Sequence, residues 1–173
     1  MTVVATQENI DLYGSPDLAW SGVRELLEAG RAQRFWLATV DADGRPHLAG
    51  IGARWVEGVL YFKSGARTRK SRNLERDGRC VISAELPDFD VTFTGEAMRV
   101  IDEPTVHRIA EIYADSGWPA RAKGSQLEAD YSAPTAGPPP WDVWTMAPES
   151  AVGLGAGGAM RWHFASRAST AHT

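Results

Sequence analysis

The sequence predicts a mainly β (α+β) fold: an antiparallel barrel with a few added helices. Apolar residues alternate with polar ones in about six or seven segments, which is the pattern of strands that are half buried. Turn-forming dipeptides at Asp43-Gly44 and Glu57-Gly58 separate the first three of these segments, as in β-hairpins. Only three segments show helical spacing, which is too few for a doubly wound parallel sheet.

The first helical segment is expected to begin at Ser15, with Pro16 at its first helical position, and to end at Gly30. Its apolar residues recur at helical spacing: Trp20, Val23, Leu26 and Leu27. We expect this helix to close one end of the sheet. Residues 1–14 show no strong pattern and are interpreted as a loosely docked arm.

A three-stranded meander is predicted next, with strands over 35–40, 46–55 and 59–63. It leads into a second helix over 69–76, for which Thr68 is the predicted N-cap and Gly78 the C-terminal stop.

The second half continues the alternation with predicted strands over 79–85 and 90–101 and a third helix that starts at Asp102-Glu-Pro104. Residues 117–140 are interpreted as a long loop, which in a compact domain is usually functional or disordered. Further strands are expected over 141–146, 151–154 and 160–164. The prediction is therefore one domain over 1–164, followed by a disordered tail over 165–173.

Composition excludes several classes of protein. The net charge of -4 argues against a general nucleic-acid binder, and no apolar run is long enough to span a membrane. The single cysteine, Cys80, excludes an intramolecular disulfide, and the four histidines lack metal-ligand spacing, so no metal is expected. No charged and apolar leader segment opens the chain, and a cytoplasmic location is expected.

Basic residues concentrate around the predicted second helix. Seven of the 18 Lys and Arg residues fall between Lys63 and Arg79. A helix N-terminus with mobile cations next to it suits a phosphate or another multiply charged anion. The alternative is a solvated basic face whose arginines pair with nearby carboxylates, as basic runs usually do.

Several motifs, in order, resemble the pyridoxamine phosphate oxidase-like, split-barrel flavoprotein superfamily. They are the hairpin Trp36-Leu-Ala-Thr-Val-Asp-Ala-Asp-Gly-Arg-Pro-His47, the strand end Leu60-Tyr-Phe62, the segment Thr68-Arg-Lys-Ser-Arg-Asn-Leu74, and Gly95-Glu-Ala97. The terminal Arg161-Trp-His-Phe164 is similar to the "TRWRF" ending of an actinobacterial branch, although Met160 and His163 replace its Thr and second Arg. The resemblance covers roughly residues 16–164.

The resemblance implies a homodimer of split β-barrels, with coenzyme F-420 (a deazaflavin) or FMN at each of two sites between the subunits. It assigns the cofactor's phosphate and ribityl chain to Lys63, Ser64, Thr68, Arg69, Lys70 and Asn73. It places the strand residues His47, Ala49, Gly50 and Ile51 along the ring system. Arg161 and Trp162, from either chain of the dimer, would close over the ring.

The function that the resemblance implies is an oxidoreductase that transfers a hydride from the bound cofactor to a small organic substrate. No catalytic residue is assigned, because the cofactor carries the reactive atom and the protein supplies binding and orientation. The alternative is a non-catalytic carrier of flavin or haem with the same fold. The Arg-Leu-His type run of true pyridoxamine phosphate oxidases is not recognisable, so pyridoxine phosphate is not the expected substrate. The loop over 117–140 is interpreted as a cover for the substrate side of the pocket.

Overall fold

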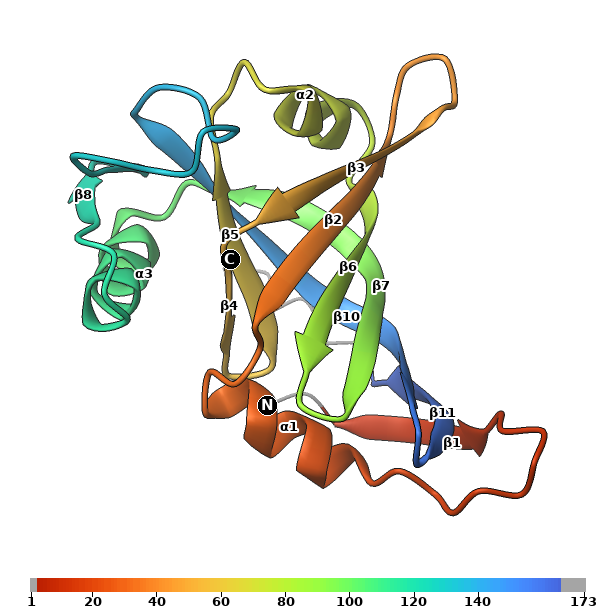
Figure 1. Ribbon diagram of the computed structural model, residues 1–173. Helices are drawn as coiled ribbons and strands as arrows, with labels where there is room; N and C mark the ends of the chain where they lie inside the picture. The colour runs from red at the N-terminus through yellow and green to blue at the C-terminus, as the bar shows by residue number, and fades with distance from the viewer. Residues whose placement is uncertain (1–2, 166–173) are drawn as a thin grey trace, which may run out of the picture.

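The computed structural model describes residues 3–165, whose strands form one antiparallel sheet curled into a barrel (Figure 1). The barrel consists of β2 (Arg34–Val40), β3 (Pro46–Ile51), β4 (Ala53–Val56), β5 (Val59–Ser64), β6 (Arg79–Leu86), β7 (Phe89–Val100) and β10 (Trp141–Gly155). Pairing runs in the order β3, β2, β6, β7, β10, β5, β4. Among the described residues β3 pairs with β2 alone and β5 pairs with β4 and β10, so the barrel is split between β3 and β5. The predicted fold class is confirmed.

Four further strands extend the sheet. The strand β1 (Val4–Asn9) pairs with β11 (Gly158–Phe164), so the prediction of a loosely docked arm was wrong. Five of the six residues of β1 are exposed on both faces, and this strand therefore lacks the alternation that would reveal it. The hairpin of β8 (Arg121–Lys123) and β9 (Gln126–Glu128) lies within the predicted loop and pairs with the start of β10.

Two strand predictions fail at backbone irregularities. The predicted strand over 46–55 divides at Gly52 into β3 and β4, where the chain crosses the split. The predicted strands over 141–146 and 151–154 are one strand, because β10 continues through Pro148 with a register shift before Ser150. Such a bulge lets a strand bend without ending it.

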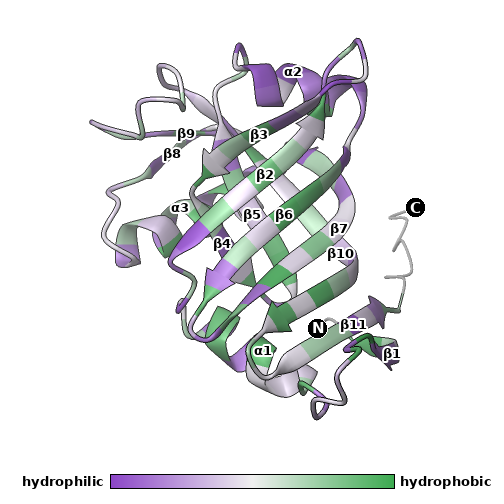
Figure 2. Cartoon of the chain, turned by 45° about the vertical axis from the view of Figure 1, so that its right-hand side comes forward, coloured by the Kyte–Doolittle hydropathy of each residue, from purple (hydrophilic) through white to green (hydrophobic). Residues whose placement is uncertain are grey.

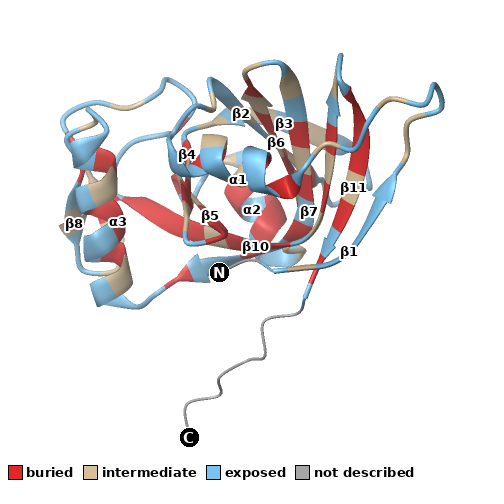
Figure 3. Ribbon diagram, turned by 90° about the horizontal axis from the view of Figure 1, so that it is seen from below, coloured by how far each residue is buried: buried red, intermediate tan, exposed pale blue. Residues whose placement is uncertain are grey.

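The helix α1 (Trp20–Glu28) lies across one end of the barrel, as predicted (Figure 3). Its N-cap is Ala19 without a side-chain cap bond, so the predicted start at Ser15 was wrong. The segment before it is held in a loop instead: Asn9 Nδ2 donates to Ser15 O (3.1 Å) and to Asp17 Oδ1 (2.9 Å).

The other two helices agree with the sequence. The helix α2 (Arg69–Arg76) is capped by the side chain of Thr68, and α3 (Glu103–Asp115) by that of Asp102. The C-cap of α2 is Asp77, one residue before the predicted stop at Gly78. In Figure 1, α2 covers the end of the barrel opposite α1, and α3 lies on the outside beside β8.

Two apolar cores hold these elements together. One fills the barrel beneath α1 and includes Leu37, Phe62 and Phe93. The other lies between α3 and the outer side of β10 and includes Ile109 and Trp141. In Figure 2 the barrel strands β6 and β10 are coloured largely green and white, whereas α2 is hydrophilic.

Cys80 is buried, as predicted, and burial raises the pKa of its thiol to about 12. Within residues 3–165 no helix is long and apolar enough to cross a membrane. The predicted disordered tail lies outside the described residues except for Ala165, whose N–H donates to Val3 O (2.9 Å).

Candidate functional site

The N-terminus of α2 is fixed by three hydroxyl groups. The Ser64 and Thr68 hydroxyls are hydrogen-bonded at 2.8 Å, and Thr68 Oγ1 lies 3.1 Å from Ser71 Oγ and accepts the Ser71 N–H at 3.4 Å. Ser64 and Ser71 have no exposed surface. Because these hydroxyls are hydrogen-bonded to one another, Ser64 and Thr68 attach the helix to the end of β5, and neither lines the cavities described below.

Arg69 and Asn73, two of the predicted phosphate ligands, bind Asp41 on the turn between β2 and β3. Arg69 pairs with both carboxylate oxygens, with Nε at 2.8 Å from Oδ1. Asn73 Nδ2 donates to Asp41 Oδ1 (2.9 Å) and to the buried Thr39 Oγ1 (3.0 Å). The Arg69 and Asn73 hydrogen bonds hold the pKa of the Asp41 carboxyl well below its usual range. These two residues therefore fasten the hairpin to α2.

Lys70 and Lys63 approach the split from the helix and from β5. The Lys70 side chain is 4% exposed, and its Nζ donates to Thr135 O at 3.1 Å. Lys63 Nζ donates to Ser132 Oγ and lies 4.0 Å from the centre of the Trp118 ring and 4.5 Å from that of Trp141. Neither lysine has a carboxylate partner among the described residues.

Burial lowers the pKa of both lysines. For Lys63 the pKa falls to about 8, because burial disfavours its charged form and the positive charge of Lys70 adds a smaller effect. The pKa of Lys70 is lowered by burial. The electrostatic attraction between an anion and these two partly desolvated, mutually repelling cations would be stronger than at the protein surface.

The segment 131–137 packs over these lysines. Besides the contacts of Lys63 and Lys70, the Gly65 N–H donates to Ala136 O at 3.0 Å. Trp118 Nε1 donates to Tyr131 O (2.7 Å) and Trp141 Nε1 to Gly137 O (2.9 Å). The segment is thus ordered against the basic helix, which agrees with its interpretation as a cover for the pocket.

Two neighbouring cavities lie under this segment. The smaller, of about 20 Å³, is in the split and is lined by Gly50, Ile51, Gly52, Lys63, Lys70, Ala133, Thr135 and Ala136. The larger, of about 200 Å³, extends toward α3 and is lined by Gly52, Arg54, Lys63, Tyr113, Trp118, Tyr131, Ser132 and Ala133. Gly52, Lys63 and Ala133 border both cavities, so the two form one site with two compartments.

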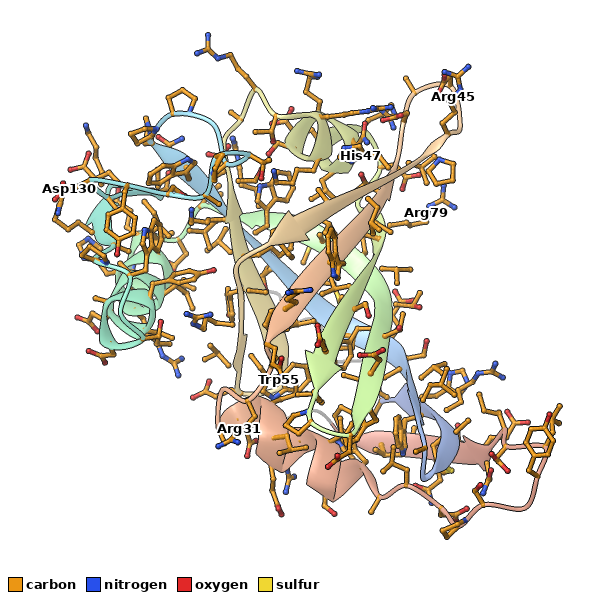
Figure 4. The ribbon with its side chains drawn as sticks, in the orientation of Figure 1. Arg31, Arg45, His47, Trp55, Arg79 and Asp130 are labelled. Atoms are coloured by element: carbon orange, nitrogen blue, oxygen red, sulfur yellow. The ribbon has the colours of Figure 1, made fainter. Side chains whose placement is uncertain are left out.

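The remaining predicted residues lie away from these cavities. His47 Nδ1 is 3.4 Å from Thr39 Oγ1 on the hairpin beside α2 (Figure 4), and Ala49 pairs with Leu37 on β2.

Arg161 lies on β11 and pairs with Glu8, and Trp162 is fully buried against Trp20 with ring centres 5.4 Å apart. Within this chain neither Arg161 nor Trp162 reaches the site: the structure places Trp162 in the core.

Several site residues escaped the sequence prediction. Arg54, Tyr113 and Trp118 come from β4, from α3 and from the turn after it, and meet Lys63 only through the fold. Ser132 and Thr135 lie in the predicted loop. The sequence feature that could have indicated these residues was the combination of aromatic residues and prolines over 118–141.

A cavity of the opposite charge lies elsewhere in the molecule. It measures about 470 Å³, lies at the β6–β7 turn, and is lined in part by Glu85, Asp88 and Asp90. Three carboxylates would repel a phosphate. Over residues 3–165 no cluster of three or more His, Cys, Asp or Glu side chains could hold a metal ion.

Fold and site together define a split-barrel protein with a cationic pocket at the split. The model of the pyridoxamine 5'-phosphate oxidase family matches residues 21–150, and the chain belongs to this family.

Solved structures share the fold at low sequence identity. An F420 reductase is 21% identical over 74% of this chain and 94% of its own, with a TM-score of 0.53. A pyridoxamine 5'-phosphate oxidase-related, FMN-binding protein from Nostoc punctiforme is 18% identical over 90% and 95%, with a TM-score of 0.58. HupZ from Group A Streptococcus is 16% identical over 82% and 98%, with a TM-score of 0.56. No curated protein matches the sequence significantly.

Proposed function

We propose that the protein is an oxidoreductase that binds a phosphorylated flavin or deazaflavin, FMN or coenzyme F420, in the split of the barrel. The observation that carries this proposal is the pair of the half-buried Lys63 and the buried Lys70, two cations without a carboxylate partner among residues 3–165. Charges removed from water are normally paired with an opposite charge. Two lysines without a carboxylate partner therefore point to an anion from outside the chain.

The donors in the split suit a phosphate group. Lys70 Nζ and the Gly65 N–H are held by the carbonyl oxygens of Thr135 and Ala136, which are neutral acceptors. A phosphate oxygen is the same kind of acceptor with a full charge, and charge-assisted hydrogen bonds are about twice as strong as neutral ones. The space of about 20 Å³ is smaller than a phosphate group, so binding requires the backbone of 133–136 to move outward.

The chain's own residues would bind and orient the cofactor. Lys63 and Lys70 would hold the phosphate, and the edge of β3 at Gly50 and Ile51 borders the same cavity. When bound, the cofactor supplies the ring that donates or accepts a hydride. The hydrogen-bonded hydroxyls of Ser64, Thr68 and Ser71 would hold the start of α2 in place while Lys70 binds the anion.

We also propose that the protein acts as a homodimer, as the resemblance implies. Large apolar side chains remain exposed on the outer face of β2 and β3: Trp36, Val40 and Leu48. A second copy placed on this face would cover them and would bring further residues close to the split.

The test is a titration of the purified protein with FMN and with F420, followed by turnover of the reduced cofactor with a panel of quinones and enones. We expect micromolar or tighter binding of at least one cofactor, and oxidation of its reduced form that depends on the substrate. Tight binding without hydride transfer would favour the carrier function. Failure to bind either cofactor would contradict the proposal.

A further inference from the structure

The larger compartment of the site has features that the cofactor's phosphate does not explain. Its volume of about 200 Å³ is room for a substituted six-membered ring. Its walls include the rings of Tyr113, Trp118 and Tyr131. Flat aromatic walls favour a planar ligand, because rings stack or meet edge to face.

Arg54 brings a second cation to this compartment. Its guanidinium lies 5.2 Å from the centre of the Tyr113 ring and donates to Ser116 Oγ through Nε (3.1 Å) and Nη2 (2.7 Å) and to Ala53 O through Nη1 (2.9 Å). Of the five N–H groups of an arginine, these bonds use three. Two N–H groups remain, one on each of Nη1 and Nη2, and can donate to a further acceptor.

No carboxylate lines the compartment, although Arg54 and Lys63 both do. Neither side chain forms an ion pair within the described part of the chain. Lys63 Nζ carries three N–H groups, one of which is directed at Ser132 Oγ. The compartment therefore offers donors and positive charge on one side and aromatic surface on the other.

The polar ends of the aromatic walls are occupied elsewhere. Tyr113 donates its hydroxyl to Gly52 O at 2.7 Å, and Trp118 Nε1 donates to Tyr131 O at 2.7 Å. These bonds fix the two rings in place. Tyr113 is 2% exposed and Arg54 lies over its ring, so the aromatic surface open to a ligand is that of Trp118 and Tyr131. Tyr131 is 59% exposed, so the compartment opens to solvent on its side.

We propose that this compartment binds a planar, one-ring aromatic carboxylate, with the carboxylate on Arg54 and Lys63 and the ring against Trp118 and Tyr131. That this ligand is the substrate rests on the proposed function; its binding to the chain does not. The compartment borders the split through Gly52 and Lys63, so a ring held there would lie next to the cofactor site.

The test is calorimetric titration of the cofactor-free protein with benzoate. Benzamide, which is planar and neutral, and cyclohexanecarboxylate, which is charged and not planar, are the comparison ligands. We expect benzoate to bind with a millimolar or tighter dissociation constant, and each comparison ligand to bind at least tenfold more weakly, a difference of about 1.4 kcal/mol. Equal binding of benzoate and benzamide, or no saturable benzoate binding, would overturn the proposal.

Two variants locate the binding. Arg54→Gln and Lys63→Gln should each weaken benzoate at least tenfold and leave benzamide within about twofold. The control is Arg121→Gln, which removes the same charge from an exposed arginine paired with Asp130 outside the compartment, and should leave benzoate binding unchanged. Benzoate affinity that survives both site variants would overturn the assignment. If Arg54→Gln does not fold, Lys63→Gln and the ligand comparison on the unmodified protein decide the question. Because these measurements contain no cofactor, their failure would leave the proposed function standing.

Discussion

Neighbouring cations on one helix have different tasks in this protein. Arg69 and Lys70 follow each other in the sequence, and both belong to the segment that resembles a phosphate-binding motif. Consecutive helical residues point in directions about 100° apart, so they cannot share one partner. Arg69 reaches Asp41 on the hairpin, whereas Lys70 is buried beneath Thr135. We therefore place the proposed anion site at Lys70 and Lys63.

This difference predicts unequal effects of two substitutions on cofactor binding. Lys70→Met should weaken binding by about 1.5–3 kcal/mol, the value of a hydrogen bond to a charged group. Arg69→Met is its control on the same helix. It should weaken cofactor binding by less than about 1 kcal/mol, because the Arg69 side chain is engaged in an ion pair with Asp41. Fluorescence titration with FMN or F420 measures both constants. A loss for Arg69→Met as large as that for Lys70→Met would return Arg69 to the site.

The lowered pKa of Lys63 predicts a dependence of stability on pH. The folded-state pKa of about 8 lies below the ordinary lysine value of 10.5. Between these values the unfolded chain binds more protons than the folded one, so the stability of the unmodified protein rises with pH from about 8 to 10.5. Below pH 8 the charged, desolvated amine costs stability in full.

Lys63→Met should therefore raise the free energy of unfolding at pH 7 by on the order of 1–2 kcal/mol. A difference of one pKa unit corresponds to ~1.4 kcal/mol, and the expected gain is smaller than the whole difference implies because solvent reaches part of the side chain. The gain should fade as the pH rises toward 10.5. Urea unfolding of both proteins at pH 7 and pH 10 measures it. A gain that is the same at both values would show that the substitution acts through packing and not through charge.

At the scale of elements, the sequence predicts best those segments whose signals are local. The cap at Thr68, the helix over 69–76 and the hairpin turns need only neighbouring residues, and the structure confirms them. The strand β1 depends instead on pairing with β11, more than 150 residues away, and its exposed side chains carry no alternation. The compartment around Arg54 escaped prediction for the same reason, since β4, α3 and the segment 131–137 meet only in three dimensions.

The strand β10 depends on a glycine where it passes under an aromatic ring. A Cβ atom on Gly153 would lie 2.8 Å from the ring of the fully buried Trp162 and 3.1 Å from Leu18. Gly153→Ala should therefore destabilise the protein by about 1–3 kcal/mol through overpacking.

The matched control is Gly157→Ala in the turn between β10 and β11, where a Cβ atom meets nothing within 4 Å. We expect its thermal midpoint to stay close to that of the unmodified protein, while that of Gly153→Ala falls. Equal midpoints for the two variants would mean that Trp162 can move aside without cost.

At the scale of the whole molecule, one sheet face is left without a partner. Trp36 and Val40 of β2 and Leu48 of β3 are 42%, 43% and 63% exposed, and the register of the two strands puts them on one face. Leu48 lies opposite Ala38, which in turn lies opposite Val81 on β6, so the apolar surface continues across three strands. A surface of this kind is typical of an interface.

Leu48→Glu should shift the proposed dimer to a monomer, because it would place a charge in the interface that we propose. Leu12→Glu is the control, since Leu12 is 92% exposed on a loop away from the sheet face. Light scattering coupled to size-exclusion chromatography distinguishes the two states. A dimer that persists in Leu48→Glu would place the interface on another face.

The central claim is that Lys63 and Lys70 form a phosphate site in the split of the barrel. It is tested most directly by comparing the affinity of the protein for FMN with that for riboflavin, which has the same ring and no phosphate, or the affinity for F420 with that for its phosphate-free ribityl deazaflavin. We expect the phosphorylated ligand to bind at least tenfold more tightly, about 1.4 kcal/mol, and this preference to disappear in Lys70→Met. Equal affinity for the two ligands, or a phosphate preference that survives both Lys70→Met and Lys63→Met, would contradict the claim.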